Sequence, residues 1–269
     1  MVTDPTLLHE LTQTLQKGGI ENAAMEAKWI LEDMPDAETA RYVANRRATH
    51  YPLQYLLGGW EFYGLYFHVG EGVLIPRADT ETLVDTVLQY GHLPQQATIA
   101  DLCTGSGCIA LALQSQRKND TIYGIEKSEV ALAYAKKNAV YHNMTVHFQL
   151  ADVLDPQTAT SFTNMDVIVS NPPYLTAEDM KQLQEEVRYE PQMALAGGTD
   201  GLHFYRNITA LWKNSLKAGG MLAFEVGIHQ AEAVREILHT HGLVNIGIVP
   251  DLCGIQRVVY GYSDTTKSN

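Results

Sequence analysis

The stretch with the clearest chemical potential is Ser170-Asn171-Pro172-Pro173-Tyr174. It follows the mostly apolar run 166–169, which has the composition of a buried parallel strand. The two prolines end the strand and stiffen the backbone after it. The sequence therefore predicts a carboxamide and an aromatic ring on a rigid loop at the carboxyl end of a strand. The carboxamide offers one acceptor and one donor group, and the proline carbonyls are also free to accept, which suits a neutral NH2 group held while it reacts.

A second candidate is the loop Asp101-Leu102-Cys103-Thr104-Gly105-Ser106-Gly107, between a predicted strand at 98–102 and a helix beginning near Ile109. Its glycines allow a sharp turn and a close approach to a ligand, and the N–H groups at the helix start favour an anionic group. Glu126 ends the next predicted strand, about 20 residues on, where a carboxylate can accept from ribose hydroxyls. With Ala110 the loop also satisfies the dinucleotide pattern G-x-G-x-x-A. These features alone do not separate NAD from S-adenosylmethionine.

Two further features favour S-adenosylmethionine. Asp101 opens the loop at the strand end, as in the D-x-x-x-G-x-G loop of methyltransferases that use this cofactor. Asp152-Val153 follows the third predicted strand, where such enzymes hold the adenine through an acidic side chain and a neighbouring backbone amide. Taken alone, Glu126 and Asp152 are equally compatible with solvated strand-end residues. Their register with the glycine loop and with Asn171 favours a binding role.

Composition narrows the classes of protein. The 269 residues are 45% hydrophobic, enough for one large domain or two smaller ones. The net charge of -12 argues against nucleic acid as a partner, although it leaves room for a local basic patch. The three cysteines have no C-x-x-C spacing, which predicts neither a disulfide framework nor a metal site and favours a reduced, cytoplasmic setting. The first five residues lack signal-peptide character, and no run approaches the roughly 20 apolar residues of a membrane span.

The chain divides into three predicted parts. Residues 1–58 have helical spacing of apolar residues, and the third predicted helix carries Arg41, Arg46 and Arg47. We expect these arginines on a solvated face, with a small partner-docking surface as the alternative. Residues 59–76 predict a hairpin linker, with a further turn at 70–72 before the apolar residues 73–75.

Residues 77–264 form the third part, in which predicted strands alternate with predicted helices. This alternation indicates a doubly wound, mostly parallel α/β sheet. Two of the expected helices run around 177–186 and 202–216, and the end of the chain from Ser263 is expected to fray.

Together these stretches resemble the protein glutamine methyltransferases that modify bacterial and organellar peptide-chain release factors. The resemblance runs from about residue 52 to residue 260. It is carried by the glycine loop, by Ser170–Tyr174, and by Pro52–Tyr55, Gly72–Glu81, Val187–Pro191, Ala194-Leu195 and Asp200–Leu202. Gly72–Glu81 and Val187–Pro191 are more specific than the tetrapeptide Asn-Pro-Pro-Tyr, which DNA adenine methyltransferases share. Two departures are Cys103, where many members have glycine, and Ala78, where proline is frequent; the Cys103 side chain would approach the methionine end of the cofactor.

The resemblance implies a fold, a reaction and a setting. The fold is a Rossmann-like doubly wound α/β sheet of the S-adenosylmethionine-dependent methyltransferases, with a small all-helical N-terminal domain and a β-hairpin linker. The reaction transfers a methyl group from S-adenosylmethionine to the side-chain amide nitrogen of the glutamine in the Gly-Gly-Gln motif of release factors, leaving S-adenosylhomocysteine and modulating translation termination. The partners are bacterial-type release factors, with no nucleic acid, membrane or metal, and a cytoplasmic monomer is expected.

The resemblance also implies residue roles. The Asn171 side-chain oxygen and the Pro172 carbonyl would accept the two amide hydrogens of the substrate, and Tyr174 would stack on the planar amide. The substrate site would comprise Asn171, Pro172, Pro173 and Tyr174, with Arg77 and Glu81 either shaping the pocket or forming a structural ion pair or helix cap. The cofactor site would comprise Asp101, Cys103, Thr104, Gly105, Ser106, Gly107, Glu126, Asp152, Val153 and Asn171.

Three rival functions remain open from the sequence. A nucleic-acid adenine methyltransferase would use the same tetrapeptide but needs a basic face. An NAD-dependent oxidoreductase rests on G-x-G-x-x-A and leaves Asn171–Tyr174 without a role. A non-catalytic scaffold that binds S-adenosylmethionine would bind the cofactor without transferring its methyl group.

Overall fold

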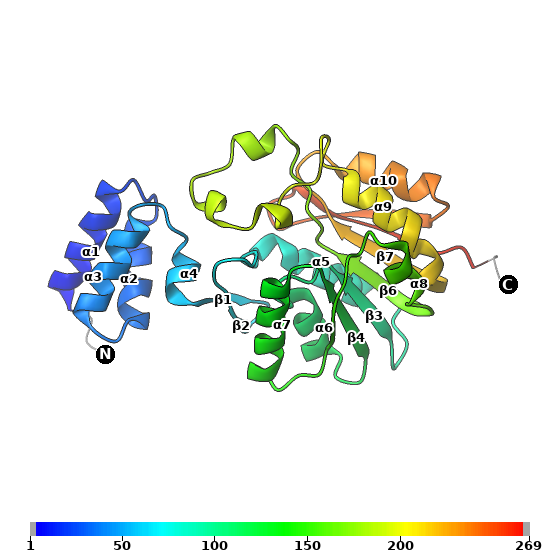
Figure 1. Cartoon of the computed structure of the whole chain (residues 1–269), viewed down its shortest axis with the longest axis horizontal. Helices are drawn as coiled ribbons and strands as arrows, with labels where there is room; N and C mark the ends of the chain where they lie inside the picture. Colours follow the sequence, from blue (N-terminus) through cyan, green and yellow to red (C-terminus); the bar gives the residue numbers. More distant parts are fainter. Residues whose placement is uncertain (1–3, 266–269) are drawn as a thin grey trace.

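The N-terminal end of the chain folds into a helical lobe of its own (Figure 1). In the computed structural model, which describes residues 4–265, this lobe contains α1 (Pro5–Lys17), α2 (Ala23–Asp33), α3 (Ala37–Arg47) and α4 (Leu53–Leu57). Leu7, Leu11 and Leu15, one apolar stripe of α1, are buried in a core with residues of α2 and α3. The helices predicted within this part of the chain are present among its described residues.

The prediction of a solvated arginine face was wrong for Arg47. Arg41 and Arg46 are exposed, but Arg47 is 3% exposed and its guanidinium donates to both carboxylate oxygens of Glu26, at 2.6 and 3.0 Å. It also bonds Glu186, 139 residues away, at 2.9 Å. A buried charge needs partners of opposite sign, and here one of them comes from the other lobe.

A two-stranded antiparallel hairpin follows the helical lobe. It consists of β1 (Gly59–Phe62) and β2 (Leu65–His68). The apolar residues 73–75 after the next turn form no ladder, although Val73 and Ile75 are buried. The Ile75 N–H donates instead to the side chain of Glu190, at 3.0 Å, so a long-range contact replaces strand pairing.

The larger lobe is built on a seven-stranded sheet (Figure 1). Its strands are β3 (Thr98–Leu102), β4 (Thr121–Glu126), β5 (His147–Leu150), β6 (Met165–Ser170), β7 (Leu216–Glu225), β8 (Val244–Pro250) and β9 (Gln256–Tyr262), in the order β5-β4-β3-β6-β7-β9-β8. Only β9 runs antiparallel to its neighbours in the sheet. The predicted mostly parallel, doubly wound α/β sheet is confirmed.

Helices cover both faces of this sheet. The helices α5 (Glu81–Tyr90), α6 (Cys108–Gln116) and α7 (Glu129–Tyr141) share one core with Val167 and Val169 of β6. The helices α8 (Pro156–Thr160), α9 (His203–Trp212) and α10 (Ala231–Thr240) share the other core, which includes Ile168. Because successive strand residues point to opposite faces, a continuous apolar strand such as β6 supplies both cores.

The helix predicted around 177–186 was wrong. This region contains only short 3₁₀ turns, Asp179–Lys181 and Glu186–Tyr189, followed by a third at Gln192–Ala194. The side chain of Asp179 accepts the Thr176 N–H at 3.0 Å, a local bond that competes with helix formation. Most side chains of 177–186 are exposed, so no apolar stripe packs a helix onto the sheet.

The ends and divisions of the chain complete the description. Among residues 4–265, no helix is long and apolar enough to cross a membrane. Residues 1–3 of the stretch assessed for a signal peptide, and residues 266–269 of the predicted frayed end, lie outside the described residues. The domain boundaries 1–58, 59–76 and 77–264 stay a prediction.

Removing the Arg47 guanidinium should destabilise the protein, because it would leave the buried Glu26 carboxylate without its partner. We expect Arg47→Met to lower the free energy of unfolding by about 3 kcal/mol, measured by urea denaturation followed by circular dichroism. Arg41→Met is the matched control, because Arg41 pairs with Glu10 on the surface at 2.8 Å and both side chains are nearly half exposed. Equal midpoints for the two variants would contradict a buried, energetically important Arg47.

Candidate active site

The strand order brings the two candidate loops together. β3 pairs with β6 in the centre of the sheet, while the chain leaves β3 toward β4 and β5 and later returns to β6 on the other side. Ligands of open α/β sheets bind at such a switch point, beyond the carboxyl ends of the strands. The glycine loop follows β3 and Asn171 follows β6. The two candidate stretches therefore lie next to each other at the carboxyl edge of the sheet.

The glycine loop has a left-handed backbone at three positions. Cys103, Gly105 and Gly107 have φ angles of 60°, 57° and 80°. A Cβ added at Gly107 would approach Ala135 and Phe148 to 3.2 Å, so glycine allows close packing there. A Cβ added at Gly105 would meet no protein atom within 4 Å, because this residue borders the pocket.

Cys103 adopts a conformation that disfavours most side chains. Cys103 lines the pocket. Desolvation raises the pKa of its thiol, so the thiol is neutral at pH 7. A neutral, compact thiol is compatible with a wall position beside a ligand.

Asp101 lies under the loop and is fully buried. Its Oδ2 accepts from the Thr104 hydroxyl and from the Ala110 N–H, and its Oδ1 has no hydrogen-bond partner among the described residues. Burial raises the pKa of the Asp101 carboxyl to about 7, against the hydrogen bond from Thr104, which favours the charged form. Asp101 does not line the pocket. It holds the loop in place through its bonds to Thr104 and Ala110.

Asn138 of α7 links the loop to the hairpin. Its Nδ2 donates to the carbonyls of Ser106 and His68, at 3.0 and 3.1 Å, and its Oδ1 accepts the His68 N–H at 2.8 Å. The hydroxyl of Ser106 is buried without a partner among residues 4–265. These bonds fix the position of the loop relative to the linker.

Glu126 lies at the end of β4 with its carboxylate fixed by three backbone amides. It accepts from Gly105 at 2.9 Å, from Lys127 at 2.9 Å and from Ser128 at 2.8 Å. A carboxylate has about four acceptor positions, so capacity for a further donor remains. The residue lines the pocket, as its predicted role requires.

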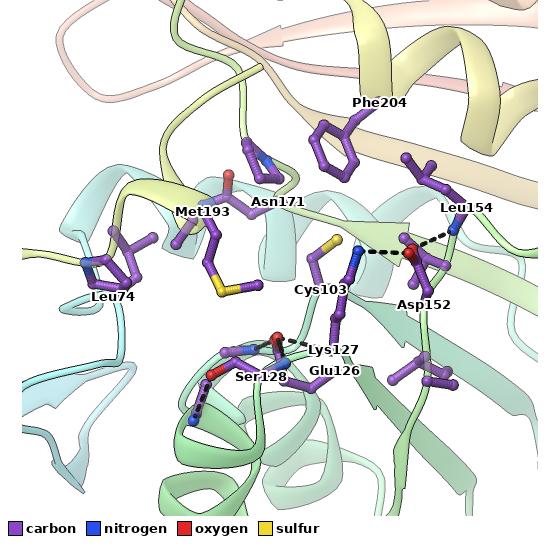
Figure 2. Close-up of a pocket in the computed structure, with 18 of the residues that line it drawn as sticks. Leu74, Cys103, Glu126, Lys127, Ser128, Asp152, Leu154, Asn171, Met193 and Phe204 are labelled. Atoms are coloured by element: carbon purple, nitrogen blue, oxygen red, sulfur yellow. Dashed lines mark hydrogen bonds and ion pairs between the residues drawn. The ribbon is translucent and has the colours of Figure 1, made fainter. Parts of the chain in front are cut away.

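Asp152 stands opposite, at the end of the segment after β5. Figure 2 shows Lys127 reaching to its carboxylate, at 2.7 Å, and the Leu154 N–H bonding the same group at 2.9 Å. Burial alone would raise the pKa of Asp152, but the hydrogen bonds from Lys127 and Leu154 lower it overall. Val153 is held by its carbonyl, which accepts the Trp212 indole N–H at 2.8 Å, while its own N–H has no hydrogen-bond partner within 4–265.

These residues surround one pocket of about 730 Å³, counting its open side. Volumes of this order are usual for small-molecule sites. Sequence reasoning missed several lining residues: Figure 2 shows Phe204 on the side of the pocket away from Glu126, and Met193 extending from near Asn171 toward Glu126. Lys127 directly follows the predicted Glu126 and could have been found from that position. Met193 and Phe204 come from distant segments and carry no local signal.

Asn171 forms the boundary of this pocket. Its Nδ2 donates to the hydroxyl of Thr80 at 3.2 Å. Pro172 and Pro173 are buried, and the Pro172 carbonyl accepts no hydrogen bond from residues 4–265. The amino group of the Asn171 side chain is thus bonded by Thr80. The Asn171 Oδ1 and the Pro172 carbonyl oxygen accept no hydrogen bond from residues 4–265.

Tyr174 packs tightly at the end of the same loop. A Cβ added at Gly197 or Gly201 would meet its backbone at 2.6 or 2.4 Å, and one at Gly227 would meet its ring at 3.0 Å. Gln230 bonds the Tyr174 carbonyl at 2.9 Å. Desolvation raises the pKa of the phenol, so the ring is neutral at physiological pH.

A second cavity, of about 570 Å³, meets the first at Asn171. Arg77 and Tyr174 line it, and Leu74, Asn171 and Ala194 border both cavities. Arg77 forms an ion pair with the buried carboxylate of Glu190. Glu81 lies elsewhere: its carboxylate accepts the Tyr63 N–H at 2.7 Å, next to the hairpin, and the residue borders neither cavity.

The described part of the chain contains no group of three or more His, Cys, Asp or Glu side chains placed to hold a metal ion.

Comparison with known proteins gives consistent matches. The family model described as Methyltransferase small domain matches residues 79–198. A release factor glutamine methyltransferase of Geobacter sulfurreducens is 40% identical over 92% of each chain, and one of Thermodesulfovibrio yellowstonii is 41% identical over 83% of this chain and 80% of its own. A solved methyltransferase structure from Pyrococcus furiosus has a TM-score of 0.55 over 76% of this chain and 91% of its own, at 15% identity, and so shows the fold.

Asp101 should give the protein a pH-dependent stability. Its carboxyl has a pKa of about 7 when folded, against an ordinary value of 3.8. Between these values the folded state binds more protons than the unfolded state, so stability falls as pH rises. We expect the stability of Asp101→Asn, relative to the wild-type protein, to increase from about pH 4 to about pH 7 and then level off.

Denaturant midpoints measured at several pH values would test this expectation. Asp200→Asn is the control, because the hydrogen bond from Arg206 holds the pKa of Asp200 at about 2. That group is ionised in both states between pH 5 and 7, so its variant should differ from wild type by a constant amount. An Asp101→Asn difference that is equally constant would contradict the buried, protonatable carboxyl.

Proposed function

The chain belongs to the release factor glutamine methyltransferase family, and we propose that it transfers a methyl group from S-adenosylmethionine to the side-chain amide nitrogen of a glutamine in a peptide chain release factor. The relatives' names and their near full-length coverage support this substrate class. The observation that carries the proposal is the junction of two cavities at Asn171, whose amino group is held by Thr80. A reaction between a bound cofactor and a bound side chain needs such a junction.

The substrate glutamine is proposed to be that of the Gly-Gly-Gln motif, so that methylation modulates translation termination. The second cavity is bordered largely by apolar residues: Leu74, Leu175, Val187, Ala194 and Leu195. Glycine neighbours have no side chains that would have to pack against these apolar residues, so the glutamine side chain of such a loop can enter the cavity alone. The lining of the cavity therefore supports a glycine-flanked glutamine as the substrate.

The cofactor is proposed to occupy the first pocket. The residues present fit S-adenosylmethionine: Gly105 leaves open space where a side chain would stand, Glu126 keeps an acceptor position for a ribose hydroxyl, and Val153 has an unused N–H for the adenine. Asp152 would accept from the adenine amino group in exchange for Lys127. Cys103, Thr104, Ser106 and Gly107 shape the loop around the ligand, with Asp101 beneath it and Asn171 at its methyl end.

The mechanism follows from how this chain holds the amide. S-adenosylmethionine supplies an electrophilic methyl group when it is bound. Asn171 Oδ1 and the Pro172 carbonyl would each accept one hydrogen of the substrate NH2 group, which fixes the direction of the nitrogen lone pair. Fixed acceptors also stabilise the positive charge that would develop on nitrogen as the new N–C bond forms and the methyl–sulfur bond breaks, with S-adenosylhomocysteine as the leaving group. The nitrogen then loses one proton to water, and Tyr174 would stack against the amide plane.

Arg77 and Glu81 are proposed to act differently from each other. Arg77 borders the substrate cavity and, through Glu190, holds the wall of that cavity in place. Glu81 bonds the Tyr63 N–H and would act as a structural tie between the hairpin and α5. A cytoplasmic location, a monomeric state and the absence of nucleic acid from the reaction stay predictions.

A methyl-transfer assay tests the function directly. The protein is incubated with methyl-labelled S-adenosylmethionine and an unmethylated bacterial release factor, and the label is located by peptide mass spectrometry. Label on the glutamine of Gly-Gly-Gln is expected. A release factor whose Gln is replaced by Ala is the substrate control. Label elsewhere, or none while the cofactor still binds, would contradict the proposed substrate.

Asn171→Ala should lower kcat by about 100-fold or more, because it removes one preorganised acceptor. The variant should still bind the cofactor, since Glu126 and Val153 are unchanged. Asn207→Ala is the control and should keep wild-type turnover, because this half-buried residue of α9 bonds the His203 carbonyl within its own helix and borders neither cavity. A folded Asn171→Ala protein with wild-type kcat would remove Asn171 from the mechanism.

Cofactor choice is testable by calorimetry. We expect S-adenosylmethionine and S-adenosylhomocysteine to bind and NAD not to bind. Glu126→Ala should weaken S-adenosylmethionine binding by about tenfold or more, because a ribose hydroxyl loses a charged acceptor worth about 1.5–3 kcal/mol. Glu129→Ala, three residues on at the start of α7 and outside the pocket lining, is the control. NAD binding in preference to S-adenosylmethionine would restore the oxidoreductase alternative.

A further inference from the structure

A buried carboxyl group that the mechanism above does not use lies at the end of β7. Glu225 is 1% exposed, and its Oε2 has no hydrogen-bond partner among the described residues. A carboxyl group buried without full hydrogen bonding costs several kcal/mol. An apolar residue or a glutamine in this position would cost less, so a function that needs the carboxyl is the natural explanation.

The neighbours of Glu225 connect it to the active site. Thr80 and Asn171 lie beside its carboxyl, where their donor groups favour the charged form and lower the pKa of Glu225. Thr80 in turn accepts from Asn171 Nδ2 at 3.2 Å. The three residues come from different parts of the chain: Thr80 from the 3₁₀ turn Ala78–Thr80, Asn171 from the loop after β6, and Glu225 from β7. Because β6 and β7 are parallel neighbours with Ser170 opposite Phe224, Asn171 and Glu225 emerge from adjacent strand ends.

The chemistry of these groups sets a direction. An ionised carboxylate has only acceptor sites, so the Thr80 hydroxyl must donate to it. The Thr80 oxygen then has lone pairs left and accepts from the Asn171 amino group. The carboxamide oxygen of Asn171 is consequently on the opposite side, facing the junction of the two cavities. The reverse orientation would present an NH2 group to the substrate NH2 group, which cannot form a hydrogen bond between two donors.

We propose that Glu225 is a positioning residue that, directly and through Thr80, holds the Asn171 carboxamide with its oxygen toward the substrate amide. This role rests on the proposed methyl transfer to a glutamine amide, which needs two acceptors on the substrate nitrogen. Glu225 does not itself touch the substrate, and Thr80 is the second member of the same device.

The charge of Glu225 makes the device sensitive to pH. A protonated Glu225 carboxyl can donate to the Thr80 oxygen, and the Thr80 hydroxyl can then donate to the Asn171 Oδ1. The Asn171 carboxamide could therefore flip, with its NH2 group toward the substrate. Burial raises the pKa of Glu225 to about 7, while the hydrogen bond from Thr80 and the charge of Arg257 oppose the rise. The other titratable groups that act on the carboxyl or lie within its electrostatic reach are Asp79, Tyr174, Tyr205 and Cys108. Turnover should therefore rise with pH through the neutral range.

The first experiment compares kcat and KM for four variants with an unmethylated release factor at pH 8. Glu225→Gln keeps the shape but can donate to Thr80, and Thr80→Val removes the relay; each should lower kcat about 100-fold. Thr80→Ser keeps the hydroxyl and should restore turnover to within a few-fold of wild type. Asp120→Asn changes a buried carboxyl at the opposite end of the sheet and should leave kcat unchanged. The affinity for S-adenosylmethionine should be the same in all four.

Two readouts separate positioning from a structural role. Glu225→Gln should unfold at a denaturant concentration equal to or above that of wild type at pH 8, because it no longer buries a charge. The double variant Glu225→Gln with Thr80→Val should be no slower than the slower single variant, because both changes disable one device. Additive losses, or a kcat loss matched by a loss of stability, would overturn the proposal.

A measurement without substrate keeps this inference separate from the proposed function. In protein labelled with 15N-asparagine, the side-chain NH2 signal of Asn171, assigned by its loss in Asn171→Ala, should shift with pH between about 6 and 8 and should stop doing so in Glu225→Gln. If the release factor is not methylated but the signal titrates, the proposed substrate fails and the positioning device stands. Methylation of the release factor could be confirmed while the Asn171 signal of Glu225→Gln still shifts with pH and its kcat equals that of wild type. That result would contradict the positioning device and leave the proposed function intact.

Discussion

The parallel pairing of β3 with β6 is the constraint on which the site depends. In this register Leu102 lies opposite Ser170, so the next residues, Cys103 and Asn171, leave the sheet side by side. The Ser170 hydroxyl reinforces the pairing by donating to the Leu102 carbonyl at 2.6 Å. A slip of one residue would turn every side chain of β6 to the other face. Because β6 is apolar on both faces, its hydrophobic pattern does not select the register. The Ser170–Leu102 bond does, since a slip would break it, and so it fixes where the glycine loop and the carboxamide meet.

Polar groups buried beneath this edge reduce stability and define the site. Asp101 and Glu225 are nearly inaccessible, and each has one carboxylate oxygen without a hydrogen-bond partner in the described structure. Burial raises the pKa of both to about 7. Each lies at the end of a central strand below a loop that must keep a particular shape. The stability lost by burying them is compatible with a site that needs fixed hydrogen-bond directions more than it needs stability.

The extent to which sequence predicted this structure follows from the range of the interactions involved. The glycine loop and Asn171–Tyr174 are local patterns at strand ends, and the alternation of strands and helices defines the sheet, so both were predictable. The helix expected at 177–186 did not form, because Asp179 bonds the Thr176 N–H locally and the exposed segment has no apolar stripe to pack. Its end is held instead by the long-range bond of Arg47 with Glu186, which no local pattern indicates. Thr80 was missed for the same reason, since its bond to Asn171 spans 91 residues. Glu225, in contrast, carried the same signal as Glu126, an acidic residue ending an apolar strand.

The segment after Tyr174 connects the helical lobe to the chemistry. It supplies Ala194 to both cavities, yet its regular structure consists of short 3₁₀ turns and one β-bridge, Leu175 with Ala196. Arg47 holds it through Glu186, and Glu190 is bonded by the Ile75 N–H and by Arg77. Both anchors belong to residues that precede the sheet in sequence. Because Arg47 belongs to the helical lobe while Ile75 and Arg77 follow the hairpin, parts of the chain that precede the sheet fix the segment that borders both cavities.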